Sequence, residues 1–411
     1  MPRAKSYTRK IAKRIKKLPL IVVLPVLLVT FFLLGMYMAG TKERLNSLFR
    51  IPPSLLVSAS EKLSPKDLKE KLQNKNFTFI NVHTPYEGEI AGTDMFLEYD
   101  GMVSSKSKLP GDKNAEIIIY CKTGRMSAEA LLTLKSLGYT NIKHLSGGMD
   151  AWEVGGEKLL DLSGITGKVL PEEGFTLSLS WGDIGPRLVS LGVIDLDEFE
   201  KGINPTEEQK KILRQGGDIP LKIDGKNGQF VVDVLWALGL AQKSIVYTEG
   251  PLGKEYSGQQ GNFASTGGWT LAKGDAVGYL NRFDLIALTS DQQKRVGEIA
   301  KGVFRPCCGN STWFPDCNHG MAALAAIELL VSNGSSDDEI YKEVLKLNSF
   351  WFPDTYLTTA TYFARQGVDW EDVSAKEVLG EAYSSAMGAA DIYAKVGPLP
   401  FAGGSGGSCG A

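Results

Sequence analysis

The stretch that decides the fold of the domain around it is Glu116-Ile117-Ile118-Ile119-Tyr120-Cys121-Lys122-Thr123-Gly124-Arg125-Met126-Ser127, in a chain of 411 residues. Its first five residues form a short apolar run, which is typical of a central strand in a parallel sheet. Residues 127–137 then show the apolar spacing of an amphipathic helix, and Gly138 ends it. Cys121 is therefore expected in a tight loop between a strand and the N-terminus of a helix.

This loop has the residues needed to hold an anion above a reactive thiol. Backbone N–H groups at a helix N-terminus bind anions, and the helix dipole with Lys122 and Arg125 favours thiolate over thiol. Gly124 permits a turn that a side chain would hinder. We predict Cys121 as a nucleophile that attacks a sulfane sulfur and carries it as a persulfide. The predicted anion-binding loop consists of Lys122, Thr123, Gly124, Arg125, Met126 and Ser127.

Further elements of the same kind lie on both sides of the loop. Residues 77–82 and 141–145 are two more short apolar strands, and Ser64 caps a helix that has Pro65 at its first position. Strands that alternate with helices indicate an α/β domain with a parallel sheet. We place this domain at residues 55–157.

Two more motifs flank the loop: Asn81-Val82-His83-Thr84-Pro85-Tyr86-Glu87-Gly88-Glu89-Ile90-Ala91-Gly92-Thr93 before it and Leu145-Ser146-Gly147-Gly148-Met149-Asp150-Ala151-Trp152 after it. Together with the Cys121 loop, they resemble the rhodanese family in its single-domain form. The resemblance implies a parallel sheet with helices on both faces and a persulfide on Cys121. It also implies a small sulfur-containing anion such as thiosulfate as donor, a thiol acceptor, and no required cofactor. Asn81 and His83 depart from the family, which usually has Asp and Arg there.

Two other functions compete with sulfur transfer. Phosphatases use a similar plan of Cys, loop and Arg, but their loop is longer and the flanking motifs here favour a sulfurtransferase. In the second alternative the rhodanese-like domain is a non-catalytic docking module of a metal-binding or thiol-redox protein. The mildly acidic remainder of the chain, about −10 without the eight basic residues before Leu18, argues against a nucleic-acid partner. No P-loop motif is present, so nucleotide binding is unsupported.

An apolar run without charge extends over residues 18–41 and follows a basic segment. Its length suits a helix that spans a bilayer, and the basic flank predicts a cytoplasmic N-terminus. We therefore expect a single-pass protein of the cell membrane with its folded domains outside the cytoplasm; a cleaved signal peptide is the rival interpretation.

A second group of thiols occurs near residue 310, where Cys307, Cys308, Cys317 and His319 lie within thirteen positions. Three thiolates and an imidazole would suit zinc or a soft ion such as Cu(I), although the spacing is not that of a zinc finger. A redox pair, an acceptor for sulfur from Cys121, and a structural disulfide are the alternatives. Cys409 lies in a Gly/Ser tail, for which a disordered terminus is the favoured interpretation.

The predicted order is a basic cytoplasmic tail (1–17), a transmembrane anchor (18–41), a linker (42–54), the rhodanese-like domain (55–157), a second linker (158–170), a mainly α-helical domain with the Cys/His cluster (171–396) and a flexible tail (397–411).

Overall fold

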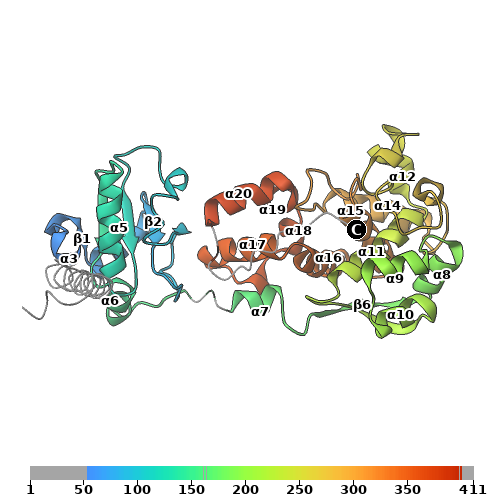
Figure 1. Ribbon diagram of the computed structural model, residues 1–411, viewed down its shortest axis with the longest axis horizontal. Helices are drawn as coiled ribbons and strands as arrows, with labels where there is room; N and C mark the ends of the chain where they lie inside the picture. The colour runs from blue at the N-terminus through green and yellow to red at the C-terminus, as the bar shows by residue number, and fades with distance from the viewer. Residues whose placement is uncertain (1–52, 161, 163, 398, 400–411) are drawn as a thin grey trace, which may run out of the picture. The chain divides into compact units, whose positions relative to one another are not determined.

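The computed structural model describes residues 53–160, 162, 164–397 and 399 (Figure 1). Within these residues no helix combines the length and the apolar character needed to cross a bilayer. The prediction of a transmembrane helix and of a single-pass location in the cell membrane is therefore corrected. The apolar run at 18–41 on which it rested, the basic tail before it and Cys409 lie outside the described residues.

The first sheet along the chain is parallel, as predicted, and has five strands, two more than the apolar runs indicated. Its strands are β1 (Lys62–Leu63), β2 (Thr78–Asn81), β3 (Met95–Phe96), β4 (Ile117–Tyr120) and β5 (Ile142–Leu145). Their order is β1-β5-β4-β2-β3, so β4 lies in the centre with a parallel partner on each side. All four residues of β4 are buried, which explains why it lacks the alternation of a one-sided strand.

Three helices flank this sheet, α4 (Pro65–Gln73), α5 (Arg125–Ser136) and α6 (Gly148–Val154), with short 3-10 turns η1 (Ala59–Glu61) and η2 (Lys106–Lys108). A short helix, α3 (Pro53–Leu56), precedes them in the chain. The side chain of Ser64 caps α4 by accepting a hydrogen bond from the Asp67 N–H, as its sequence predicted. Helix α5 begins two residues earlier than expected, at Arg125, because Gly124 adopts φ +90° and turns the chain into the helix. The Cys121 loop therefore lies at the carboxyl end of the central strand.

Helices make up most of the chain beyond residue 164. They are α7 (Ile165–Val169), α8 (Ile184–Leu191), α9 (Leu196–Ile203), α10 (Glu207–Arg214), α11 (Gly228–Ala241), α12 (Ile245–Glu249), α13 (Pro251–Lys254), α14 (Ser290–Lys301), α15 (Asn318–Ser332), α16 (Asp337–Trp351), α17 (Pro353–Arg365), α18 (Ala375–Val378), α19 (Glu381–Ser384) and α20 (Ala386–Val396). Three 3-10 turns complete them: η3 (Gln260–Asn262), η4 (Ala276–Tyr279) and η5 (Trp370–Asp372).

An antiparallel pair of strands, β6 (Phe175–Gly182) and β7 (Gly217–Ile223), was not predicted in this helical region. The apolar spacing of residues 184–199 predicts one helix, but the structure has two there, α8 and α9. Gly192 ends α8 with φ +79°, and Asp195 caps α9 through two backbone N–H groups. Local capping therefore interrupts an apolar spacing that would otherwise continue as one helix.

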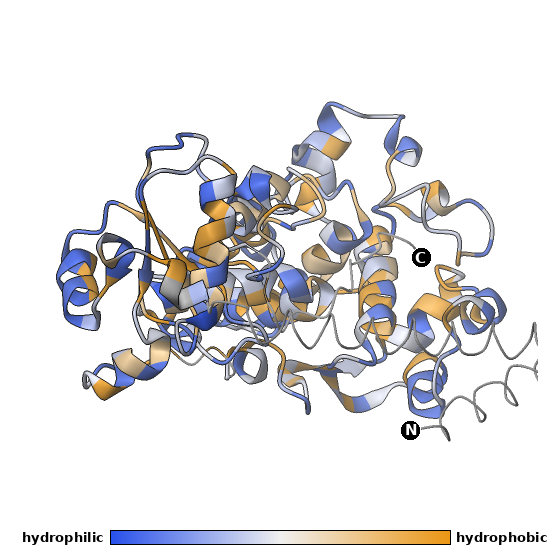
Figure 2. Ribbon diagram, turned by 60° about the vertical axis from the view of Figure 1, so that its left-hand side comes forward, coloured by the Kyte–Doolittle hydropathy of each residue, from blue (hydrophilic) through white to orange (hydrophobic). Residues whose placement is uncertain are grey.

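The central helices α11 and α15 are buried along almost their whole length and pack against each other. Figure 2 shows hydrophobic residues concentrated in the strands and inner helices, and hydrophilic residues on the outer loops. This hydrophobic core is separate from the one beneath the parallel sheet. The segment that leads into α15 carries the second thiol group, so that group lies at the N-terminal end of a fully packed helix.

Candidate functional site

The thiol of Cys121 lies at the point where the central strand gives way to α5. The backbone N–H groups of Gly124 and Ser127 donate to its Sγ at 3.1 and 3.4 Å. Cys121 itself is only 1% exposed. Two converging N–H donors at the first turn of a helix would stabilise negative charge on the sulfur or on a group bonded to it.

A short polar relay extends from the sulfur toward β5. The Ser127 hydroxyl lies 3.6 Å from Cys121 Sγ and 3.2 Å from His144 Nδ1. His144 pairs with Ile119 across the parallel ladder, which brings it beside the loop. Burial, helped by the nearby charge of Lys62, lowers the pKa of His144 and favours its neutral form. The place of His144 in a short predicted strand favours a structural role, and no local sequence pattern links it to Ser127.

The two cations of the loop both have carboxylate partners. Lys122 pairs with Glu87, whose other oxygen lies 3.3 Å from His83 Nε2. Arg125 pairs with Glu129 at 2.8 Å, one helical turn further along α5. The hydrogen bond to Lys122 is the main cause that lowers the pKa of Glu87, so this carboxylate is ionised at neutral pH. Sequence reasoning missed Glu87, although it lies within the flanking motif.

The remaining loop residues differ in exposure. Ser127 and Gly124 are buried, Met126 is half-buried, and Thr123 is exposed. Gly148 packs beneath the loop, where an added Cβ would lie 2.1 Å from the Cys121 carbonyl oxygen. A glycine there lets the start of α6 approach the backbone of the loop.

Asn81 and His83, the two departures from the family pattern, support the segment beside the loop. The Asn81 amide donates to the Gly88 carbonyl at 2.9 Å and accepts from the His83 N–H at 3.0 Å. The side chain of Asn81 therefore closes the segment that carries Glu87. Both of these hydrogen bonds stay within the segment, which agrees with a supporting role for Asn81.

The same segment is anchored by an ion pair with α17. The guanidinium of Arg365 lies 2.8 Å from a carboxylate oxygen of Glu89, and both side chains are buried. Arg365 also donates to the carbonyls of Asp94 and Val396, at 2.9 and 2.8 Å. Glu89 and Arg365 are 276 positions apart in the chain, and no sequence pattern indicated that they pair.

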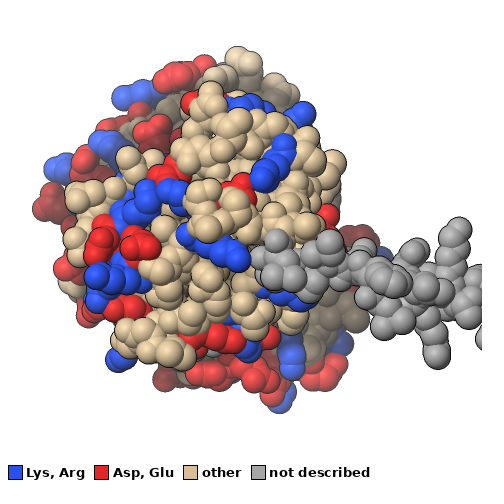
Figure 3. Space-filling model, turned by 90° about the vertical axis from the view of Figure 1, so that its left-hand side faces the viewer, with Lys and Arg blue, Asp and Glu red and all other residues tan. Residues whose placement is uncertain are grey.

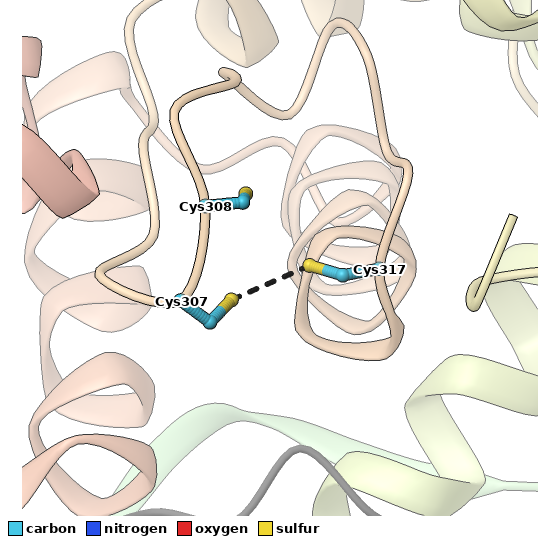
Figure 4. A group of neighbouring side chains, drawn as sticks. All are labelled: Cys307, Cys308 and Cys317. Carbon is cyan, nitrogen blue, oxygen red and sulfur yellow. Dashed lines mark hydrogen bonds between the residues drawn. The ribbon is translucent and has the colours of Figure 1, made fainter.

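The three cysteines near residue 310 meet, as their sequence proximity suggested. The Sγ atoms of Cys307, Cys308 and Cys317 all lie within 4.8 Å of one another and could hold a metal ion. Figure 4 shows Cys307 and Cys317 pointing toward each other, and their sulfurs are 3.5 Å apart. These cysteines and Cys121 are free thiols.

His319, the fourth predicted ligand, does not join this group among the described residues. Its ring packs against Phe352 with centroids 4.5 Å apart, and against Trp351 at 5.7 Å. Burial lowers the pKa of His319 to about 4. Aromatic packing from α16 and the residue after it holds the ring in this structure, and a ligand role for His319 stays a prediction.

A buried arginine that sequence reasoning missed lies against the thiols. Arg305 is 0% exposed, and its guanidinium contacts Cys317 Sγ at 3.4 Å and an Asp316 carboxylate oxygen at 3.0 Å. Hydrogen bonds from Cys307 and Cys308, with the charge of Arg305, hold the pKa of Cys317 well below its usual range. Hydrogen bonding to Cys308 and Cys317 raises the pKa of Cys307. Within the cluster, Cys317 is thus the sulfur most readily ionised.

Charged residues elsewhere on the surface are mixed in sign. On the face drawn in Figure 3, basic and acidic side chains are interspersed. Among the described residues, ion pairs such as Lys69–Glu157 and Lys135–Glu61 account for part of this mixing. Such exposed pairs contribute little to stability and are screened by salt.

Comparison with known proteins identifies the parallel-sheet region. The family described as rhodanese-like domain matches residues 64–154. The probable adenylyltransferase/sulfurtransferase MoeZ of Mycobacterium tuberculosis (strain H37Rv) is 36% identical over 95 residues, 22% of this chain and 24% of that protein. An uncharacterized Synechocystis protein is 30% identical over 96 residues, 23% of this chain and 52% of its own length. The chain thus spans about a quarter of the length of the first of these relatives.

Solved structures also resemble parts of this chain. A rhodanese-related protein from Thermoplasma volcanium shares 24% identity, with 24% of this chain and 96% of that chain covered and a TM-score of 0.22. A thiosulfate sulfurtransferase from Pseudomonas aeruginosa shares 16% identity, with 59% and 49% covered and a TM-score of 0.24.

Proposed function

We propose that this chain, whose residues 64–154 are a rhodanese-like domain, is a sulfurtransferase that carries sulfane sulfur on Cys121. The rhodanese-like domain and the relationship to a protein named as a sulfurtransferase support a transferase function of this type. The observation that carries the assignment to Cys121 is the pair of N–H groups from Gly124 and Ser127 that converge on its sulfur.

The reaction has two half-steps. The Cys121 thiolate attacks the outer sulfur of a donor such as thiosulfate, the sulfur–sulfur bond of the donor breaks, and sulfite leaves with its electron pair. An acceptor thiolate or cyanide then attacks the outer sulfur of the persulfide, and the Cys121 thiolate is regenerated. The two N–H donors, placed at the first turn of α5, stabilise the negative charge that moves onto the transferred sulfur.

The surrounding residues set the conditions for this reaction. Lys122 and Arg125 supply positive charge for an anionic donor, although Glu87 and Glu129 offset part of it. The Ser127 hydroxyl links Cys121 to neutral His144, which is placed to exchange a proton with the thiol through that hydroxyl. Donor and acceptor are thus a small sulfur-containing anion and a thiol.

Intact-mass measurement of the purified full chain before and after incubation with thiosulfate tests this proposal. We expect a gain of one sulfur atom, about 32 Da, that cyanide removes as thiocyanate, and no gain in the Cys121→Ser variant. Cys308→Ser is the matched control, because it removes another thiol outside the loop. Equal labelling of the wild type and of Cys121→Ser would refute the assignment.

A further inference from the structure

The thiol cluster of the helical region has the composition of a metal site. Cys307 and Cys308 come from the turn that the bridge between Phe304 and Ser311 closes, and Cys317 is the N-cap residue of α15. We propose that Cys307, Cys308 and Cys317 bind one thiophilic ion, Cu(I), through three thiolates and without His319.

The spacing of the three sulfurs fits one ion at their centre. Metal–sulfur bonds of about 2.3 Å place three coplanar sulfurs about 4 Å apart. Cys307 and Cys317 are 3.5 Å apart at Sγ, and each sulfur of the group lies within 4.8 Å of the others. Small movements of the cysteine side chains, without a change of rotamer, would thus bring the three sulfurs to these distances. Metal binding would release the thiol protons.

The neighbouring carboxylate is already committed to other partners. The Asp316 carboxylate binds Arg305 at 3.0 Å through one oxygen and the Asn310 amide at 2.7 Å through the other. The ring of His319 packs against Trp351 and Phe352 and does not join the ligand group within the described part of the chain. Thiolates suit both Cu(I) and zinc, but a structural zinc site takes four protein ligands. Three sulfurs, with no fourth ligand grouped with them among the described residues, therefore favour Cu(I) over a structural zinc ion.

A buried cation stabilises negative charge on one sulfur of such a site. Three thiolates and one monovalent cation carry two negative charges, and the guanidinium of Arg305, which also pairs with Asp316, stabilises the Cys317 thiolate from 3.4 Å away. Arg305 is held there by the Asn310 carbonyl at 2.8 Å as well as by Asp316. An added Cβ on Gly320 would lie 2.6 Å from that guanidinium, so a glycine leaves the space that the arginine fills. The guanidinium of Arg305 is thus fixed beside the three thiols by its own contacts.

Competition for Cu(I) by a chelator of known affinity tests the proposal on the reduced full chain under anaerobic conditions. We expect one copper per chain, and an affinity that falls by roughly a factor of 100 in Cys317→Ser, which removes a ligand. Cys308→Ser should weaken binding similarly, and it keeps the assay decisive if Cys317→Ser does not fold. Cys121→Ser and His319→Gln should bind Cu(I) as the wild type does.

X-ray absorption at the copper edge supplies a readout that does not depend on folding of the variants. Sulfur ligands alone in the first shell support the three-thiolate site. Imidazole scattering, a loss of affinity in His319→Gln, or copper retained equally in Cys317→Ser would overturn it. A Cys307–Cys317 disulfide that persists in the protein after reduction, with no copper bound, would also overturn it and favour a structural role.

Discussion

Gly148 offers the sharpest test of how the Cys121 loop is held. The first N–H groups of α6 donate to the loop: Met149 to the Cys121 carbonyl at 2.9 Å and Asp150 to the Lys122 carbonyl at 3.0 Å. These bonds satisfy N–H groups that a helix leaves unpaired, and they need a close approach of two backbones. Gly148 makes that approach with φ +61°.

Gly148→Ala should be costly for two separate reasons. An alanine at a left-handed φ costs about 1–2 kcal/mol. Its Cβ would also lie 2.1 Å from the Cys121 carbonyl oxygen and 2.4 Å from that of Lys122, so backbone must move. Overpacking of this kind costs about 1–3 kcal/mol more. We therefore expect a loss of about 2–5 kcal/mol in the free energy of unfolding.

The displaced backbone carries Cys121, so sulfur transfer should fall as well. We expect at least a tenfold loss in the rate of persulfide formation. Such a loss corresponds to a rise of about 1.4 kcal/mol in the activation free energy, which misalignment of one N–H donor would cause. Urea unfolding and thiosulfate:cyanide turnover measure the two effects on the same preparation.

Gly156→Ala is the matched control. Gly156 also has a positive φ, +87°, but an added Cβ meets no atom of the described residues within 4 Å. The free energy of unfolding of Gly156→Ala should fall only by the cost of the backbone conformation, and the variant should keep its activity. If Gly148→Ala were no less stable and no less active than Gly156→Ala, the close contact beneath the loop would not be what holds Cys121 in place.

Three more predictions concern charged residues. Glu87→Gln should lower the KM for thiosulfate roughly two- to fivefold at low salt, because Lys122 loses its exposed partner; Glu87→Asp is the control, and a KM that does not change would contradict this role. Burial raises the pKa of Glu328 to about 8, so the folded protein keeps a proton that the unfolded chain releases above its ordinary pKa near 4.5. The free energy of unfolding should therefore fall as pH rises from about 5 to 8, by up to about 5 kcal/mol, and Glu328→Gln should flatten that slope; an equal slope in both proteins would exclude Glu328 as its cause. Arg365→Gln should destabilise by about 3–5 kcal/mol because it leaves buried Glu89 unpaired, and the added change Glu89→Gln should restore part of that loss in a double-mutant cycle; strictly additive losses would show that the pair is not coupled.

The sequence indicated the strand–loop–helix around Cys121 because its signals are local. Residues 117–120 are apolar without alternation, and this is what burial on both faces of a central strand requires. The glycine before α5 and the helical spacing after it lie within a few residues of the thiol. Sheet order and register follow from strands that are far apart in the chain, so His144 beside Ile119 became visible only in the fold.

The thiol cluster shows the limit of reasoning from proximity. Cys307 and Cys317 do meet, because a short turn returns the chain to the start of α15. His319 is closer to Cys317 in sequence, yet its ring is held by Phe352, which is more than thirty positions away. The choice between ligand and core residue thus depended on packing, and an aromatic neighbour at that distance leaves no periodic signal.

The segment between Asn81 and Glu89 contacts both the neighbouring Cys121 loop and the distant helix α17. Glu87 pairs with Lys122 of the predicted anion-binding loop, and two residues later Glu89 pairs with Arg365 of α17. Since both carboxylates lie close together in a short segment that the Asn81 amide braces, we expect a shift at Arg365 to change the position of Glu87 as well. The charge that an anionic donor would meet at Lys122 should therefore depend on a residue at the end of α17. This dependence predicts that Arg365→Gln alters the KM for thiosulfate in addition to stability, whereas a purely structural ion pair would leave the KM of the folded fraction unchanged.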